Sequence, residues 1–417
     1  MLKQIEGSLG IAEAVALCRP GAVCAYPISP QTHIVENLGK MVKTHQLKDC
    51  EFVNVESEFA AISVSIGASA GGVRTYTATA SQGLLFMTEG VYNASGLGLP
   101  IVMTVASRAI GAPINIWNDH SDSLSQRDSG WLQLFCESNQ DAVDTHIMAF
   151  KIAEEVGLPV MVCMDGFVLT HAFERLDIPS QEQIDKFLPE YQPREYLDPK
   201  EPISMGAMVG PEAFTEVRIL QQRKMYKALD VIERVTKEYR ELTGHHSGGL
   251  LDCYNCENAD VKLIIMGSTV GTAKDAVDEL KAQGINAGII SLKSFRPFPY
   301  AAVREAIGDT KKVVLVERHF SYGARGILFP EVARALKGLD TEVHTAVCGL
   351  GGRAILGSTI KNIVKYSLEG KFTDELTWFD LDSALLNSYL KDTEGVTLPE
   401  GPLAESVLEE SLQKVRA

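Results

Sequence analysis

Apolar runs typical of buried strands alternate with helical patterns along the first 165 residues of the chain. Residues 31–44, for example, carry Ile34, Val35, Leu38 and Met41 at the spacing of one buried helix face. Regular alternation of this kind predicts parallel strands joined by right-handed crossovers, which is a doubly wound α/β sheet. The predicted strands are 22–26, 52–55, 74–79, 101–106, 131–136 and 159–165, and the predicted helices are 7–21, 31–44, 58–70, 82–95 and 141–156.

A second, shorter alternation follows and predicts a smaller α/β domain. The stretch between the two alternations has a different character. Residues 179–202 hold five prolines among charged side chains, which is typical of an extended arm, and residues 214–242 have the pattern of a long amphipathic helix. Residues 243–249 are typical of a linker, in which we interpret His245 and His246 as solvated side chains rather than ligands.

These patterns divide the chain of 417 residues, which is too long for one core, into four expected segments. We expect the large sheet domain in residues 1–178 and the arm, long helix and linker in residues 179–258. The smaller domain is expected in residues 259–375, and a packing arm with a terminal helix in residues 376–417.

Charge and hydropathy narrow the classes of partner. The net charge is −15, from 39 basic and 54 acidic side chains, which argues against nucleic acid or an anionic membrane as a partner. No apolar run approaches the length of about 18 residues that a membrane span needs, and the amino-terminal residues lack the pattern of a signal peptide. We therefore expect a cytoplasmic protein.

The eight cysteines are scattered through apolar runs, which favours reduced core thiols over a disulfide framework. Cys253 and Cys256 form the one CxxC pair, which is half of a zinc or cluster site. The multiple-cysteine runs that hold iron–sulfur clusters are missing from the sequence. We therefore expect no metal bound by this chain, and we expect any electrons to be handled by another chain.

Polar side chains follow four of the predicted strands at the point where each strand ends. Ser29 follows the first strand, Glu56 and Glu58 the second, the turn Thr79–Gly83 the third, and Arg108 the fourth. Because the carboxyl ends of parallel strands lie at one edge of a sheet, these groups should line one crevice that suits a carboxylated ligand. Each also has a structural interpretation: Glu58 and the Thr79–Gly83 turn as helix caps, and Arg108 as a surface ion-pair partner. Arg108 lies near the start of a polar loop, residues 107–130, which is long enough to indicate a function.

Seven short motifs connect this pattern to a known family: Tyr26–Pro30, Val55–Ala61, Thr79–Leu84, Ser107–Ala109, Asp119–Asp122, Ser294–Pro299 and Gly349–Arg353. Together, and in this order, they resemble the α subunit of the 2-oxoacid:ferredoxin oxidoreductases, of which the pyruvate enzyme (pyruvate synthase) is the familiar member. The resemblance implies a pyrimidine-binding-like thiamine diphosphate domain followed by a domain like the carboxyl-terminal domain of transketolase. It also implies oxidative decarboxylation of a 2-oxo acid to acyl-CoA and CO2, with electrons passed to ferredoxin, and the reverse reaction with a low-potential donor.

The resemblance implies a role for each residue of the expected crevice. Glu58, with Glu56 as a weaker candidate, would bond the aminopyrimidine ring nitrogen of the cofactor and favour the tautomer that accepts the proton of the thiazolium carbon. Arg108 would grip the substrate carboxylate. Asp119, His120 and Asp122 would line the approach loop without a specific role. Further cofactor contacts are expected from Ile28, Thr79, Ser81 and Gln82.

Ser29 stands where the pyruvate enzymes typically carry Thr, beside the reacting carbonyl. The missing methyl group leaves room for a larger acid such as phenylglyoxylate, 2-oxoisovalerate or 2-oxoglutarate, although one methyl discriminates by only about 1–3 kcal/mol. Pyruvate therefore remains the first expectation. An Arg here would have indicated oxalate.

The family's metal–diphosphate signature, a Gly-Asp-Gly followed by a distant Asn, is missing from this sequence. The resemblance therefore implies that Mg2+ and a [4Fe-4S] cluster belong to a β-type partner subunit, with a γ-type subunit and a ferredoxin-like subunit completing the complex and coenzyme A as co-substrate. Two alternatives remain open: half of another thiamine-dependent enzyme, of transketolase or 2-oxoacid dehydrogenase type, and a non-catalytic scaffold for electron-transfer subunits.

Overall fold

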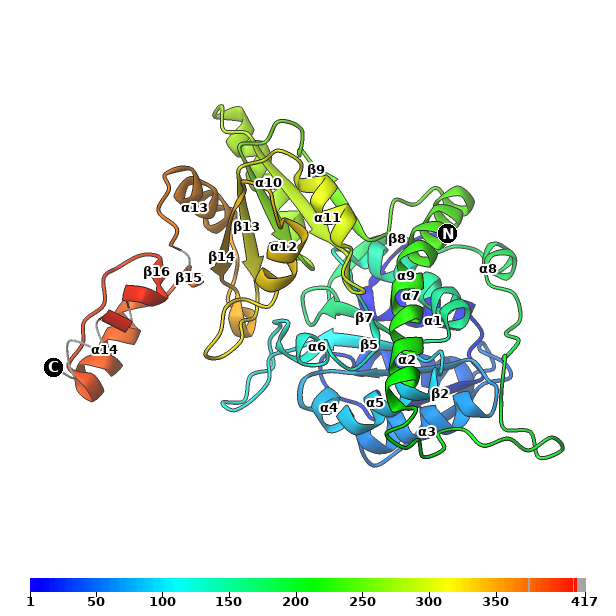
Figure 1. Ribbon diagram of the computed structural model, residues 1–417. Helices are drawn as coiled ribbons and strands as arrows, with labels where there is room; N and C mark the ends of the chain where they lie inside the picture. The colour runs from blue at the N-terminus through cyan, green and yellow to red at the C-terminus, as the bar shows by residue number, and fades with distance from the viewer. Residues whose placement is uncertain (374–375, 408, 411–417) are drawn as a thin grey trace. The chain divides into compact units, whose positions relative to one another are not determined.

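The computed structural model describes residues 1–373, 376–407 and 409–410 of the chain (Figure 1). These residues form two compact units. The first comprises Met1–Leu250 together with Lys293–Pro299, and the second comprises Leu251–Leu292 and the described residues from Tyr300 onward.

The first unit is built on a seven-stranded sheet in the order β12-β6-β7-β5-β4-β2-β3. All pairs in it are parallel except that of β12 with β6. The central strands β4, β5 and β7 are buried along their whole length. Accordingly, β5 and β7 consist mostly of apolar and small residues, whereas β4 alternates Thr with Tyr76 and Ala78. The strands are β2 (Ala22–Ala25), β3 (Glu51–Asn54), β4 (Thr75–Thr79), β5 (Val102–Ser107), β6 (Leu132–Phe135), β7 (Val160–Asp165) and β12 (Ser294–Arg296).

Helices cover the sheet in the doubly wound arrangement that the sequence predicts. From β2 the chain crosses outward through α2 to β3, and it returns through α3 past β2 to β4, so right-handed crossovers place α2 and α3 on opposite faces. The predicted helix 82–95 is two helices that meet at Met87. The helices are α1 (Gly7–Leu17), α2 (Thr32–Lys43), α3 (Glu58–Ala70), α4 (Ser81–Phe86), α5 (Thr88–Leu97), α6 (Ser121–Ser125) and α7 (Asn139–Val156).

Further elements complete the first unit. The strands β1 (Leu2–Glu6) and β8 (Phe173–Asp177) pair antiparallel in a separate two-stranded sheet. The stretch expected as an extended arm contains α8 (Gln181–Phe187), because Ser180 and Gln183 form a capping box and Ile184 is buried. The long helix is α9 (Phe214–Thr243), and it packs on α7.

The interpretation of His245 as a solvated linker residue is wrong. Its imidazole keeps only 14% of its side-chain surface exposed, and Nδ1 lies 3.0 Å from Oδ1 of the fully buried Asp144. Asp144 also accepts hydrogen bonds from the hydroxyls of Tyr239 and Ser247. A buried carboxylate needs such partners, and the bond to Asp144 raises the pKa of His245. The residues after α9 are therefore anchored to α7.

The segment Lys293–Pro299 lies in the first unit, although its position in the sequence falls within the expected second domain. β12 adds to the sheet edge beside β6, and the backbone N–H of Phe135 donates to the carbonyl of Lys293 at 2.7 Å. The ammonium of Lys293 is buried, and it lies 2.6 Å from Asp141 and 3.1 Å from Glu137. This ion pair satisfies a charge that burial would otherwise destabilise.

The second unit has a seven-stranded sheet of its own, in the order β16-β15-β14-β13-β10-β11-β9. Its two edge strands β9 and β16 are antiparallel to their neighbours and the inner pairs are parallel. The strands are β9 (Leu251–Tyr254), β10 (Val261–Ile265), β11 (Ala287–Leu292), β13 (Lys312–Glu317), β14 (Glu342–Val347), β15 (Leu376–Trp378) and β16 (Leu403–Ala404). The helices are α10 (Thr269–Ala282), α11 (Tyr300–Ile307), α12 (Phe329–Ala335), α13 (Gly357–Leu368) and α14 (Ser383–Glu394), with a short turn η1 (Leu350–Gly352).

The last forty residues are more than the packing arm that we expected. Their described part supplies β15 and β16 to the sheet edge, and α14 stands between these strands in the sequence. A small cluster of Leu390, Val396, Leu398 and Leu403 holds this part together. Residues 411–417, to which the expected terminal helix also extends, lie outside the described residues. No helix among those described combines the length and the apolar character that crossing a membrane requires.

Candidate functional site

The carboxylate of Glu58 lies at the start of α3, against the turn that follows β4. Ser57 fixes this start, because its hydroxyl accepts a hydrogen bond from the backbone N–H of Ala60 at 3.2 Å. A Cβ on Gly83 would lie 2.7 Å from both Oε1 of Glu58 and Oγ1 of Thr79, so the turn accepts only glycine at this position without rearrangement. Glu58 is 8% exposed, whereas Glu56 is exposed. Its burial and its position beside Gly83 therefore favour Glu58 over Glu56 as the carboxylate of the site.

Thr79 ends β4 with a hydroxyl that the protein leaves unsatisfied. The side chain is fully buried, and its Oγ1 has no hydrogen-bond partner among the described residues. Orphaned buried hydroxyls are costly, and they recur where a ligand supplies the missing partner. Thr79, Gly83 and the Glu58 carboxylate thus form a closely packed polar cradle at the end of β4, with a hydroxyl and a carboxylate that could bond the edge of a ligand.

Arg108 follows β5 and reaches across to the end of β2. Its Nη1 donates to the carbonyl of Ser29 at 2.8 Å, and its Nε donates to the carbonyl of Asn115 at 3.1 Å. Burial lowers the pKa of Arg108, while the nearby Asp122 opposes this shift. Across the described part of the chain, Nη2 of Arg108 makes no hydrogen bond. The bonds from Nε and Nη1 hold the guanidinium in place, and Nη2 keeps its donors for a ligand.

Asp122 is one of three loop residues, with Asp119 and His120, to which sequence reasoning gave no specific role. It is fully buried, and its Oδ2 accepts hydrogen bonds from the backbone N–H groups of Ser81 at 2.8 Å and of Arg108 at 2.9 Å. Oδ1 accepts a third from Ser123 at 2.6 Å. Burial raises the pKa of Asp122 to about 6, against the lowering effect of these three bonds. The carboxylate joins the turn after β4 to the loop after β5, and the only signal for it was its place in the Asp119–Asp122 motif.

The other expected cofactor contacts occupy the same strand ends. Ser81 is buried with φ of +50°, and its hydroxyl donates to the carbonyl of Ala109 at 2.5 Å, so it supports the loop rather than facing open space. Ile28 and Gln82 are half-buried, and Ser29 is exposed. The ends of β2, β4 and β5 are therefore brought together as expected, with Ser81 in a supporting position.

The loop of residues 107–130 is folded around buried polar pairs. His120 Nε2 lies 2.9 Å from Oδ1 of Asp165 at the end of β7, and both side chains are at most 2% exposed. Asp119 accepts hydrogen bonds from both the N–H and the hydroxyl of Ser121, whose Oγ in turn accepts from the N–H of Ile110. These pairs fix the loop beside Arg108, whereas Ile114 and Trp117 of the same loop are exposed.

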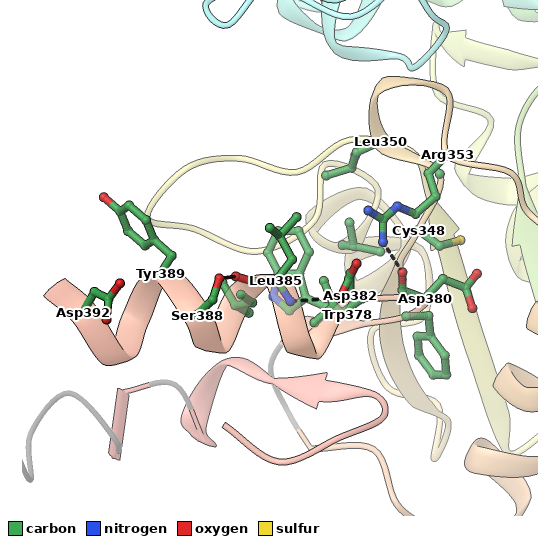
Figure 2. Close-up of a pocket in the computed structure, with 15 residues that line it drawn as sticks. Cys348, Leu350, Arg353, Trp378, Asp380, Asp382, Leu385, Ser388, Tyr389 and Asp392 are labelled. Atoms are coloured by element: carbon green, nitrogen blue, oxygen red, sulfur yellow. Dashed lines mark hydrogen bonds between the residues drawn. The ribbon is translucent and has the colours of Figure 1, made fainter. Parts of the chain in front are cut away.

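The second unit holds two further features. Cys253 and Cys256 interact as thiols, and chiefly this interaction lowers the pKa of Cys256 to about 7 and raises that of Cys253. A pocket of about 750 Å³ lies between α14 and the ends of β14 and β15 (Figure 2). Its wall includes the Gly349–Arg353 turn, where Arg353 donates a hydrogen bond to the carbonyl of Asp380. None of the crevice residues predicted from the sequence lines this pocket.

A doubly wound sheet with a polar edge at the carboxyl ends of its strands, followed by a smaller sheet unit, defines an α/β protein whose ligand site is expected at that edge. Residues 13–239 match the family described as pyruvate flavodoxin/ferredoxin oxidoreductase, thiamine diphosphate-binding, and residues 259–360 match the pyruvate:ferredoxin oxidoreductase core domain II. The chain belongs to the pyruvate flavodoxin/ferredoxin oxidoreductase family. The resemblance, the fold class and the assignment as an oxidoreductase that the sequence predicts are confirmed.

Several relatives are similar over almost their whole length. The chain is 44% identical to the pyruvate synthase subunit PorA of Methanosarcina barkeri, over 92% of this chain and 97% of that one. It is 45% identical to PorA of Methanocaldococcus jannaschii, over 91% and 98%. The ketoisovalerate oxidoreductase subunit VorA of Pyrococcus abyssi is 38% identical, over 91% and 98%.

Solved structures agree in fold. The 2-oxoglutarate:ferredoxin oxidoreductase from Magnetococcus marinus, with 2-oxoglutarate, coenzyme A and succinyl-CoA bound, aligns with a TM-score of 0.66 at 20% identity. The alignment covers 88% of this chain, and this chain spans 65% of that one. A split gene transketolase, an inactive β4 tetramer, aligns with a TM-score of 0.50 at 15% identity, over 88% of this chain and 99% of that one.

Proposed function

We propose that this chain is the α subunit of a CoA-acylating 2-oxoacid:ferredoxin oxidoreductase of the pyruvate type. The complex would decarboxylate a 2-oxo acid oxidatively to acyl-CoA and CO2, and would run as a synthase when a low-potential donor is present. The observation that carries this proposal is the cradle of Glu58, Thr79 and Gly83, which supplies a buried carboxylate and an unsatisfied hydroxyl at the end of β4. The names of the relatives support the reaction class.

The cradle fits the aminopyrimidine ring of thiamine diphosphate. Thr79 offers the hydroxyl that lacks a partner, Glu58 offers a carboxylate to the ring nitrogen, and the absence of a side chain on Gly83 lets these two groups approach each other. When bound, the cofactor would supply a nucleophilic carbon for attack on the 2-oxo group. Glu58 would hold a proton at the ring nitrogen, and it would thereby make the ring's amino group basic enough to take up the proton of that carbon.

Arg108 would orient the substrate. The carbonyls of Ser29 and Asn115 already take one N–H of Nη1 and that of Nε, and so they fix the guanidinium plane. The remaining donors on Nη1 and Nη2 suit the carboxylate of a 2-oxo acid, and the burial of Arg108 strengthens such a pair. Asp122 would act as a positioning residue, because it holds the backbone from which Arg108 extends.

We propose pyruvate as the substrate, because the relatives at 44% and 45% identity are pyruvate synthase subunits. The competing candidates are 2-oxoisovalerate, 2-oxoglutarate and phenylglyoxylate. Ser29 is exposed at the strand end and lacks the methyl group of Thr, which gives a larger acid some room. A ketoisovalerate oxidoreductase subunit, VorA, is also a relative, at 38% identity, which keeps 2-oxoisovalerate among the candidates.

We propose that the rest of the reaction center belongs to partner subunits in the cytoplasm. A β-type subunit would hold Mg2+, the diphosphate and a [4Fe-4S] cluster, and γ-type and ferredoxin-like subunits would complete the complex, with coenzyme A as co-substrate. The relatives are named as subunits, and the metal–diphosphate signature is missing from this sequence. The half of another thiamine enzyme and the non-catalytic scaffold remain the alternatives.

The test is anaerobic viologen reduction by the complex purified with its natural partners, with thiamine diphosphate, coenzyme A and each 2-oxo acid in turn. We expect activity with pyruvate above the other acids, and none from this chain alone. Glu58→Gln should lower kcat by about 10²–10⁴-fold, whereas the matched control Glu56→Gln should not. An unchanged kcat in Glu58→Gln would favour the scaffold, and the absence of activity with every acid in an intact complex would favour another thiamine enzyme.

A further inference from the structure

Two imidazoles and a carboxylate meet in the first unit, outside the residues proposed for the reaction. Glu6 ends β1 at the start of α1, His33 lies in the first turn of α2, and His171 lies in the segment between β7 and β8. One ligand atom from each of the three lies within 4.8 Å of the others. Three segments far apart in the sequence thus place the donor atoms that divalent transition metals prefer around one point.

The three side chains are already oriented toward one another. Nδ1 of His33 lies 2.7 Å from Oε1 of Glu6, so the two share a proton in a hydrogen bond. Nδ1 of His171 lies 2.7 Å from the hydroxyl of Thr170, which leaves Nε2 of His171 as its ligand atom. A hydroxyl or carboxylate on the second nitrogen of a ligating imidazole is a recurrent feature of metal sites, because it fixes the ring orientation.

Hydrogen bonds anchor Thr170, the residue before His171, to the start of α1. Its side chain is buried, and its carbonyl accepts hydrogen bonds from both the N–H and the hydroxyl of Ser8, near the start of the helix that follows Glu6. His171 is therefore held against the segment that carries Glu6. His33 keeps 45% of its side-chain surface exposed, so it has room to adjust.

We propose that Glu6, His33 and His171 bind one divalent transition-metal ion, with Zn2+ as the best match for two imidazoles and a carboxylate. The ion would replace the proton shared by His33 and Glu6, whose atoms lie 2.7 Å apart and would separate to about 3.4 Å as tetrahedral ligands at roughly 2.0–2.2 Å from one metal. The third ligand must close a separation of up to 4.8 Å by about 1.4 Å to reach the same spacing. The fourth position would take water, as in zinc sites with three protein ligands.

The rings of His33 and His171 lie 4.8 Å apart, centroid to centroid, so a third side chain joins the pair of His33 and Glu6. The competing interpretation is an ordinary surface ion pair between His33 and Glu6. Such a pair would not require His171 beside it.

A metal at this point would stabilise the loop beside Arg108. The ring of Phe167 lies 4.8 Å from that of His171 and 5.2 Å from that of Trp117, centroid to centroid. The carbonyl of Trp117 accepts the N–H of Ala109, the residue after Arg108, at 2.9 Å. An ion that cross-links β1, α2 and the His171 segment would therefore fix one end of this aromatic row.

The test is a zinc titration of the full-length chain in a Cys253→Ser, Cys256→Ser background, which removes the competing dithiol. Zn2+ would compete with a chromophoric chelator, and Co2+ would report the ligand field by its visible absorption. We expect one ion per chain, and at least a tenfold loss of affinity in His33→Ala and in His171→Ala, whereas the exposed His45→Ala should bind as before.

Two outcomes would overturn the proposal. One is the absence of a bound ion at a Zn2+ excess over the folded background protein. The other is an affinity unchanged by His33→Ala, which alters a half-exposed side chain and should leave the fold intact, as circular dichroism would verify. Because the readout is metal content rather than turnover, its failure is separate from failure of the proposed reaction.

Discussion

The backbone N–H of Arg108 donates to Oδ2 of Asp122 at 2.9 Å, and the same oxygen accepts the N–H of Ser81 at 2.8 Å. One buried carboxylate oxygen thus joins the residues that follow β4 to those that follow β5. The consequence is that the position of the Arg108 guanidinium depends on a side chain from the loop, not only on the sheet.

Asp122→Asn should destabilise the first unit and weaken substrate binding. The amide has one acceptor oxygen, so at least one of the three N–H groups at this point loses its partner, at a cost of about 1–3 kcal/mol. The change would be measured as the free energy of unfolding and as KM for the 2-oxo acid in the assembled complex. Asp128→Asn, at an exposed position of the same loop, is the control. Equal stabilities and KM values for the two variants would contradict the joining role of Asp122.

Arg108→Lys should raise KM for the 2-oxo acid by about 10–100-fold. The ammonium is a point donor, so it cannot satisfy the carbonyls of Ser29 and Asn115 and still offer a planar pair of donors to a carboxylate. Steady-state kinetics of the complex would measure the effect. Arg127→Lys, in the same loop, should leave KM unchanged, and a similar change in both variants would show that Arg108 does not grip the substrate.

Glu317 should make the stability of the second unit depend on pH. It ends β13 fully buried, its Oε2 accepts the N–H of Leu328 at 3.0 Å, and burial raises its pKa to about 8. Because this folded pKa lies above the unfolded value, the folded state holds an extra proton between about pH 4.5 and 8. The free energy of unfolding should therefore fall as pH rises through this range.

Glu317→Gln removes this titration, since the amide stays neutral. We expect the variant to gain thermal stability over the natural chain as pH increases from 6 to 9, as measured by Tm at each pH. Glu305→Gln, at an exposed position of α11, should follow the natural chain. Parallel Tm curves for Glu317→Gln and the natural chain would mean that Glu317 is not protonated in the folded state.

Cys256 should be the thiol that reacts first with iodoacetamide near neutral pH. The thiol of Cys253 and the ammonium of Lys262 lower the pKa of Cys256 to about 7 against the effect of burial, whereas burial raises that of Cys50 to about 12. Its alkylation rate, followed by peptide mass spectrometry, should reach half its maximum near pH 7. Cys253→Ser should move that midpoint upward. Equal rates at Cys50 and Cys256 would contradict the pairing.

The sequence predicted the elements of the first sheet well, because local spacing decides them. The α2 face of Ile34, Val35, Leu38 and Met41 is buried as predicted, and α3 begins at Glu58 as predicted, because Ser57 caps it. The failures fall where distant residues decide. β12 joins the first sheet, and His245 is drawn in by Asp144, which lies about a hundred residues earlier in the chain.

The candidate site was also predicted in part. That Glu58, the Thr79 turn and Arg108 follow neighbouring strands is a property of sequence order and of parallel topology, and the structure brings these groups to the strand ends. The resemblance favoured Glu58 over Glu56, but the order of residues alone could not show which of the two faces the Thr79 turn, since both follow the same strand. The start of α3 decides this, because it buries Glu58 against Gly83 and leaves Glu56 exposed.

The sequence by itself determined the fold class, the family and the residues that carry most of the proposed chemistry, because hydrophobic spacing and short motifs are local properties of a chain. Only the tertiary structure decided the joining role of Asp122, the burial of Lys293 between Asp141 and Glu137, and the meeting of Glu6, His33 and His171. These groups are separated along the chain and become neighbours only when packing excludes water and leaves each charge or polar atom to find its partner within the protein.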